Sequence, residues 1–203
     1  MSRGLLLVIS GPAGSGKGTV IKYLMEKERD IAYSVSATTR SPRPGEVDGV
    51  NYHFISVDEF KSRIEHGGIL EYTEYCGNFY GTPKKEAEDV LDAGKNLILE
   101  IEVEGAANVK RICPDAVLIM LLPPSHAEQE RRLRGRGTEP EDKILARLAQ
   151  AREEIKQLGI YDYIVYNQDG AAEECAQDIS SIIRAERLSR RRNPDAESKF
   201  LGN

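Results

Sequence analysis

Residues 11 to 19 read GPAGSGKGT and place four glycines around a single lysine, Lys17. Glycine lets the backbone curl so that several N–H groups point at one anion, and side chains would block that approach. A short apolar run precedes this segment and a helical pattern follows it, so a helix N-terminus adds its partial positive charge. The pattern predicts a P-loop that binds a nucleoside triphosphate through Gly11, Pro12, Ala13, Gly14, Ser15, Gly16, Lys17, Gly18 and Thr19.

The end of this loop departs from the usual pattern. A P-loop ordinarily closes with Gly-Lys followed by Ser or Thr, whose hydroxyl helps to hold magnesium. Here Gly18 occupies that place and Thr19 follows it. Two arrangements stay open: Thr19 holds the ion from one position later, or phosphates and water hold it.

A second group of residues suits another phosphate. Arg40 and Arg43 lie close together in an irregular segment, and the planar guanidinium grips phosphate oxygens through two hydrogen bonds. Downstream, Glu71 can accept two parallel hydrogen bonds. Guanine offers such a donor pair, its N1–H and exocyclic amino group, and adenine does not. Such a carboxylate would suit guanine and would not suit adenine.

Strand-like and helix-like stretches alternate along the chain. Continuous short apolar runs are typical of parallel strands covered on both faces. Helix starts are indicated by Thr82-Pro83 and by capping boxes at Ser125/Glu128 and Thr138/Glu141, and Gly94 ends one helix. We expect an α/β fold with a mostly parallel sheet flanked by helices. The expected strands are 5–9, 97–103, 116–122 and 162–166, and the first and last helices are 17–29 and 171–192.

Two stretches do not follow this alternation. Residues 34–82 are rich in Tyr, Thr, Ser, Gly and Pro and predict a small lobe with its own short strands. Residues 132–142, RLRGRGTEPED, look too charged and glycine-rich for a core and resemble a mobile lid. We expect a single domain over 1–203, with a core (1–33, 83–131 and 148–203), a lobe (34–82) and a lid (132–147).

Composition excludes several classes. The 203 residues carry a net charge of −5, which argues against a dedicated nucleic-acid binder. No apolar run reaches the length of a membrane span, and the N-terminal run is too short for a signal peptide. The three cysteines are widely separated, with neither metal-ligand nor disulfide spacing. The three histidines form no group. We expect a cytoplasmic protein with reduced thiols, no membrane or nucleic-acid partner and no protein-only metal site.

Several blocks, in order, resemble guanylate kinase. They are TTRSPRPGEVDGVNY, GNFYGT, LEIEVEG, RRLRGRGTE and YDYIVYN, and the similarity spans roughly residues 4–190. The resemblance implies a P-loop core, a GMP-binding lobe and a lid. It also implies transfer of the terminal phosphate of ATP to GMP with Mg²⁺, in purine nucleotide metabolism.

The same resemblance assigns roles by position. Glu71 matches the carboxylate that reads guanine, with Ser36 and Thr82 as hydroxyl partners, and Glu102 falls where many members have an aspartate that faces the guanine. We expect Glu100 and Glu102 on one face of a strand. The residues matched to the GMP phosphate are Arg40, Arg43, Tyr52 and Tyr80. Lys17 and the lid arginines, Arg132, Arg136 and Arg147, match catalytic residues, and Asn167 falls near the adenine pocket.

Alternatives remain at this point. The Gly-Lys-Gly-Thr ending is more similar to adenylate kinases, and the Glu100/Glu102 pair replaces a commoner aspartate pair. The arginines of 131–136, taken alone, would be read as a solvated charged face. A catalytically weak guanylate-kinase-like binding module and a different nucleoside monophosphate kinase both stay open, and the choice of acceptor discriminates between them.

Overall fold

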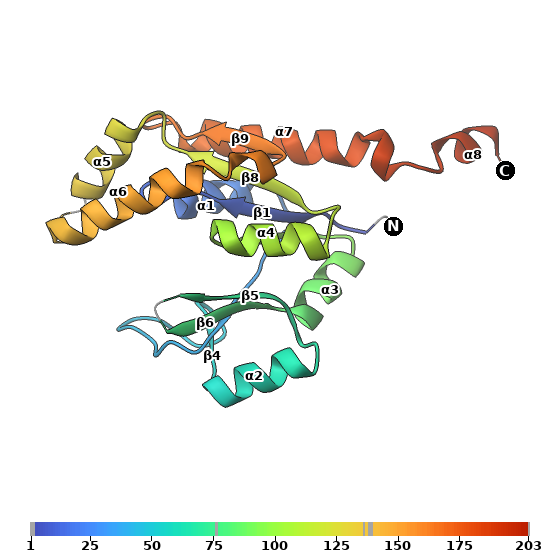
Figure 1. Ribbon diagram of the computed structural model, residues 1–203. Coiled ribbons are helices and arrows are strands. Elements are labelled where there is room, and N and C mark those ends of the chain that lie inside the picture. Colours follow the sequence, from blue (N-terminus) through green and yellow to red (C-terminus); the bar gives the residue numbers. More distant parts are fainter. Residues whose placement is uncertain (1–2, 76, 136, 138–139, 203) are drawn as a thin grey trace.

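The computed structural model describes residues 3–75, 77–135, 137 and 140–202. Two sheets organise the chain (Figure 1). The larger is five-stranded, in the order β2-β7-β1-β8-β9, and every pairing in it is parallel. Its strands are β1 (Leu6–Ser10), β2 (Ile31–Tyr33), β7 (Asn96–Glu100), β8 (Val117–Leu122) and β9 (Tyr163–Tyr166). The predicted α/β fold with a parallel sheet is confirmed.

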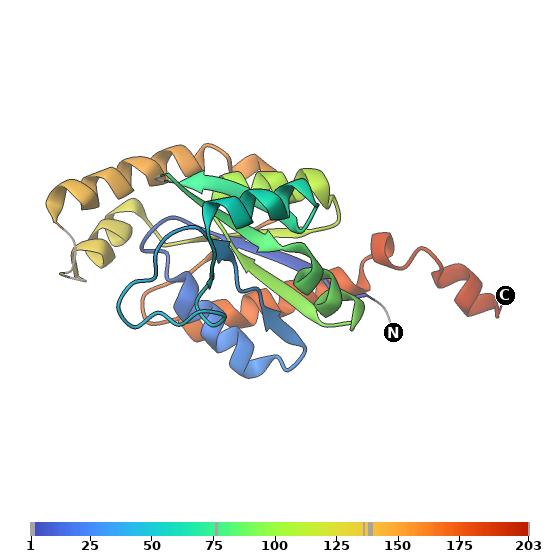
Figure 2. The same ribbon diagram turned by 90° about the horizontal axis from the view of Figure 1, so that it is seen from below.

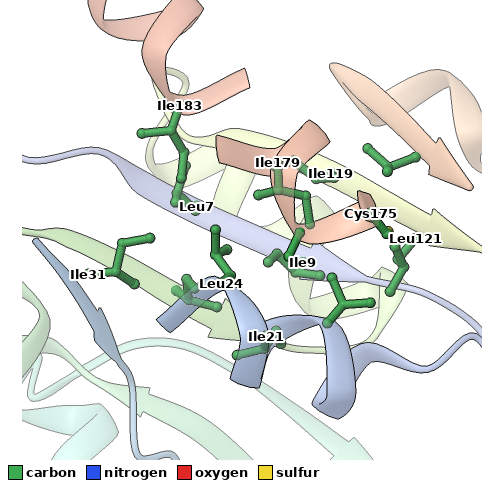
Figure 3. Packing of buried hydrophobic residues seen from close by; sticks show 14 of the residues in the cluster. Leu7, Ile9, Ile21, Leu24, Ile31, Ile119, Leu121, Cys175, Ile179 and Ile183 are labelled. Atoms are coloured by element: carbon green, nitrogen blue, oxygen red, sulfur yellow. The ribbon is translucent and has the colours of Figure 1, made fainter. Parts of the chain in front are cut away.

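Helices cover both faces of this sheet. Side chains alternate between faces along a strand, so Leu7 and Ile9 of β1 lie on one side and Leu6 and Val8 on the other. On the first side they pack against α1 (Lys17–Lys27) and α7 (Ala172–Leu188), as Figure 3 shows around Leu24 and Ile179. On the second side they pack against α3 (Lys84–Asp92) and α4 (Val103–Ile112). This two-sided burial explains why β1 is continuously apolar.

A smaller four-stranded sheet has the order β4-β3-β6-β5. It consists of β3 (Ala37–Thr38), β4 (His53–Phe54), β5 (Ile69–Tyr75) and β6 (Asn78–Pro83), and α2 (Val57–Glu65) packs on it. Phe60 of α2 is fully buried and stacks on Phe79 with ring centroids 5.4 Å apart. In Figure 1 this sheet and α2 lie to one side of the large sheet, next to α4.

The remaining helices lie at opposite ends of the molecule in both views (Figures 1 and 2). At one end, α5 (His126–Gly135) and α6 (Glu141–Ile155) pack through Leu133, Ile144 and Leu148. At the other end, α7 is followed by a 3₁₀ turn (Arg190–Arg192) and α8 (Ala196–Leu201). A further 3₁₀ turn covers Leu158–Ile160. None of the helices in the described part of the chain is both long and apolar enough to cross a membrane.

Several local expectations were wrong. Residues 132–135 complete α5, and Leu133 is buried because it packs against Ile144 and Leu148 of α6. The helix expected over 171–192 is α7, which ends at Leu188 since Ser189 takes an extended conformation.

Of the three predicted helix N-caps, one is present, one is absent and one lies outside the described residues. The hydroxyl of Ser125 accepts the backbone N–H of Glu128, as expected. Thr82 does not cap α3, because Pro83 takes that position and the Thr82 hydroxyl is used elsewhere. The N-cap of α6 is Pro140, and Thr138 lies outside the described residues.

Candidate nucleotide-binding and active site

The glycine loop joins the carboxyl end of β1, at the centre of the sheet, to the first residue of α1. Gly14 and Gly16 have φ values of 85° and 88°, in the left-handed region that favours glycine. A Cβ on Gly11 would lie 2.3 Å from the Leu121 carbonyl oxygen. Three of the four glycines are therefore required by the backbone path, and α1 presents its N-terminus to the loop.

Two buried amide side chains hold the loop from below. Asn167 Nδ2 donates to the Ser15 carbonyl at 2.8 Å, and Gln129 Nε2 donates to the Ala13 carbonyl at 2.9 Å. A Cβ on Gly16 would come within 2.3 Å of Asn167 Nδ2. Asn167, expected near the adenine, is thus a support of the loop in this structure. Gln129 was not identified from the sequence, because it belongs to no motif.

The loop forms one wall of a cavity of about 420 Å³. Lys17 lies at the start of α1, and its ammonium donates to the Gly11 carbonyl at 2.5 Å. Arg147, Gln150 and Glu154, all from α6, line the cavity opposite the loop. Burial and the negative charge of Glu102 raise the pKa of the Glu154 carboxyl. The cavity is therefore lined by the predicted phosphate loop and also by one face of α6, which the loop motif does not reveal.

A second cavity, of about 340 Å³, opens beside the small sheet. Glu71 of β5 is only 4% exposed, and the Thr82 hydroxyl donates to its Oε1 at 2.8 Å. Burial raises the pKa of Glu71 to about 7, although the hydrogen bonds from Thr82 oppose that rise. Gly105 of α4 leaves room here, because a Cβ would lie 3.1 Å from Glu71 Oε2. A buried carboxyl of this kind calls for a ligand with hydrogen-bond donors.

The other residues expected around GMP divide into two groups. Ser36, Arg43, Tyr52 and Tyr80 line this second cavity together with Glu71. The Arg40 guanidinium is not among the lining groups, because it pairs with Glu46 at 2.9 Å and lies over the Tyr52 ring, 5.4 Å from its centroid. The structure thus brings these four together around the carboxylate, while Arg40 lies against the Tyr52 ring.

The two cavities share a wall made of Lys17, Tyr75, Glu100 and Glu102. Glu100 ends β7 and accepts a hydrogen bond from the Tyr33 hydroxyl at 3.2 Å. The expectation that Glu102 lies on the same strand was wrong. It is the N-cap of α4, where its carbonyl accepts the Ala106 N–H, because β7 ends at Glu100 and the helix begins at Val103. Both carboxylates nevertheless face the junction between the cavities.

The lid arginines are placed differently from one another. Arg147 lines the loop cavity. Arg132 instead pairs with Glu128 at 2.7 Å and donates to the Asn167 carbonyl at 2.9 Å, so it supports the segment that supports the loop. Arg136 lies outside the described residues. Arg131 and Arg134 form exposed ion pairs, as in a solvated face.

The loop cavity offers a divalent cation few protein ligands. Within the described residues, no three His, Cys, Asp or Glu side chains are grouped to hold a metal ion. A Cβ on Gly18 would meet no atom within 4 Å, and Thr19 supplies a hydroxyl to the cavity. Carboxylates and a hydroxyl beside a phosphate cradle fit Mg²⁺, which keeps several waters and binds mainly to substrate phosphates.

A phosphate-binding loop at the carboxyl end of a central parallel strand, next to a second cavity with a buried carboxylate, defines a P-loop phosphotransferase. A family model described as guanylate kinase matches residues 3–186. The chain belongs to the guanylate kinase family.

Individual guanylate kinases are similar to this chain over nearly its whole length. The guanylate kinase of Clostridioides difficile (strain 630) is 49% identical over 195 residues, which are 95% of this chain and 94% of the relative. That of Halalkalibacterium halodurans is 50% identical over 190 residues, or 94% and 92% of the two chains. A crystal structure of guanylate kinase from Anaplasma phagocytophilum has a TM-score of 0.75 and 38% identity, and the match covers 93% of this chain and 88% of that one.

Proposed function

We propose that this protein transfers the terminal phosphoryl group of ATP to GMP, giving ADP and GDP. The observation that carries the proposal is the wall shared by the two cavities. Lys17, Glu100 and Glu102 border both, so a triphosphate on the loop and a nucleotide beside Glu71 would meet at one junction. Such proximity is the main requirement of phosphoryl transfer, which asks little covalent chemistry of the protein.

On the donor side, the loop amides and Lys17 would bind the phosphates of ATP. Arg147 lines the same cavity and would stabilise the charge that develops on the transferring group. Arg136 is proposed for the same role on sequence resemblance alone. Arg132 is proposed as a support, since it binds the Asn167 carbonyl. No general base is needed, because the phosphate of GMP is already an anionic nucleophile.

On the acceptor side, Glu71 would read guanine. In its ionised form, its two oxygens accept hydrogen bonds from N1–H and the exocyclic amino group, and Thr82 holds the carboxylate in place. Ser36 would add a further hydroxyl contact. Arg43, Tyr52 and Tyr80 would bind the phosphate, with Arg40 paired to Glu46 against the Tyr52 ring. Adenine lacks this donor pair, so AMP would leave a buried carboxylate unpaired.

Magnesium is proposed as the cation that accompanies ATP and neutralises charge between its phosphates. Thr19 is the hydroxyl available at the end of the loop. We also propose that residues 34–82 form the GMP-binding lobe and 132–147 a lid on a core of the remaining residues. Closure of the lid would exclude water and protect ATP from hydrolysis. A cytoplasmic location and a place in purine nucleotide metabolism stay predictions of the sequence.

The test is ADP release from ATP and Mg²⁺ with GMP, dGMP, AMP or UMP as the acceptor. Rapid release with GMP, alone or together with dGMP, is the expected result. Release with AMP instead would keep the loop assignment and overturn the guanine site. GMP binding without release under any condition would favour a binding module.

A further inference from the structure

One face of α6 points at the phosphate loop. Arg147, Gln150 and Glu154 are spaced three and four residues apart, so they lie along one side of the helix, and all three line the loop cavity. Arg147 has a role in the proposed transfer. Gln150 and Glu154 have none so far, although they border the same space.

Glu154 has an unusual environment for a carboxylate. It is 8% exposed, and its Oε1 accepts a hydrogen bond from Gln150 Nε2 at 2.8 Å. Its Oε2 is buried and has no hydrogen-bond donor among the residues that the structure describes, while burial and the neighbouring Glu102 carboxyl raise the pKa of Glu154. Leaving a buried carboxylate oxygen without a partner is costly. The geometry therefore indicates a partner that arrives with the ligand.

The charges around the cavity restrict what that partner is. Lys17 borders the cavity, but its ammonium already donates to the Gly11 carbonyl. Glu102 on the shared wall adds a second negative charge near Glu154. Lys17 and Arg147 in the same cavity attract the phosphates of ATP, but both carboxylates would repel them. A cation between the phosphates and Glu154 removes this conflict, and the hydroxyl that commonly helps to hold that cation is missing at Gly18.

We propose that Glu154, oriented by Gln150, binds the divalent cation of the ATP complex through one of the waters on that cation. This rests on the proposed function, because it assumes that the loop binds ATP. Magnesium dehydrates reluctantly and is commonly bound by one or two carboxylates together with substrate phosphates. Glu154 thereby takes over part of the task of the missing hydroxyl.

The test compares the affinity of a non-hydrolysable ATP analogue with and without Mg²⁺, by calorimetry, in the wild type and in Glu154→Gln. The ratio of the two affinities measures the contribution of the cation. Outer ligands of a metal ordinarily contribute ~10- to 100-fold in metal affinity, so we expect the ratio to fall by at least ~10-fold in the variant. Mn²⁺ in place of Mg²⁺ allows the bound ion to be followed by electron paramagnetic resonance.

Glu153→Gln is the matched control. Glu153 is the neighbour of Glu154 on α6, and its carboxylate is exposed and pairs with Lys156 at 2.7 Å. It should keep the wild-type ratio. If Glu154→Gln does not fold, Glu154→Asp tests the same point, because it keeps the charge on a shorter arm and should lower the ratio partly.

Two outcomes would overturn the inference. One is a ratio within about twofold of the wild type in a folded Glu154 variant. The other is an equal loss of affinity with and without the cation, which would mark a purely structural role. If the wild type itself does not bind the analogue, the proposed function fails, and this inference fails with it.

Discussion

Glu71 should make the stability of the ligand-free protein depend on pH. Its ordinary pKa of 4.5 is raised to about 7, chiefly by burial. Between these values the folded state keeps a proton that the unfolded state has lost, so the free energy of unfolding falls as pH rises. With these two pKa values, the loss between pH 5 and pH 8 is on the order of 2–3 kcal/mol.

The perturbation is Glu71→Gln, which keeps the size of the side chain and removes the titration. Chemical unfolding of both proteins at the two pH values gives four free energies. The free energy of unfolding of the variant, relative to that of the wild type, should rise by roughly 2–3 kcal/mol on going from pH 5 to pH 8. All other titrating groups are common to both proteins and cancel in the difference.

Saturating GMP provides an internal check. Guanine donors would favour the ionised carboxylate and lower its pKa, so GMP should stabilise the wild type more at pH 8 than it stabilises the variant. The difference in free energy of unfolding between the variant and the wild type should change with pH. A difference that is the same at pH 5 and pH 8 would refute the reasoning, because Glu71 would then titrate alike in the folded and unfolded states.

Three further predictions concern the phosphate loop. Arg147→Ala should lower kcat by ~10³-fold or more while the KM for ATP changes far less, and steady-state kinetics with unchanged kcat would exclude Arg147 from the transfer. Gly16→Ala should weaken binding of an ATP analogue by at least ~10-fold, because the backbone of Gly16 is left-handed and a Cβ there would strike Asn167. Gly18→Ala has open space around the added Cβ and should bind the analogue normally. Equal effects of the two substitutions in calorimetry would contradict this prediction. Asn167→Ala leaves the Ser15 carbonyl without its donor, and a loss of ~1–3 kcal/mol should appear in ATP binding but not in the KM for GMP.

The phosphate loop could be predicted from sequence because its requirements are local. The loop glycines and Lys17 are adjacent in the chain, and the strand before them and the helix after them are visible as short patterns. The alternation of strands and helices likewise gave the parallel sheet. Glu71 was identified with the help of the family resemblance, since nothing in its own neighbourhood shows that it is buried.

Other features depend on contacts between distant parts of the chain. The hydrogen bond from Gln129 to Ala13 joins residues 116 positions apart, and no pattern announces it. Glu154 continues the buried spacing of Ile144, Leu148 and Ala151 on α6, but a charged residue does not announce its burial, which only the tertiary packing provides.

Glu102 was placed on a strand because alternating charged and apolar residues suit one. Whether such a stretch ends as a strand or begins a helix is decided by the packing of α4, which begins at the next residue, Val103.

The most direct test of the account is the ratio of kcat/KM for GMP to that for AMP, in the wild type and in Glu71→Ala. A site that reads a pair of donors through a buried carboxylate can reject an analogue by ~10⁴–10⁵. We expect the wild type to show a large preference for GMP and the variant to lose most of it. An unchanged ratio in the variant would contradict the assignment of Glu71 as the residue that reads guanine.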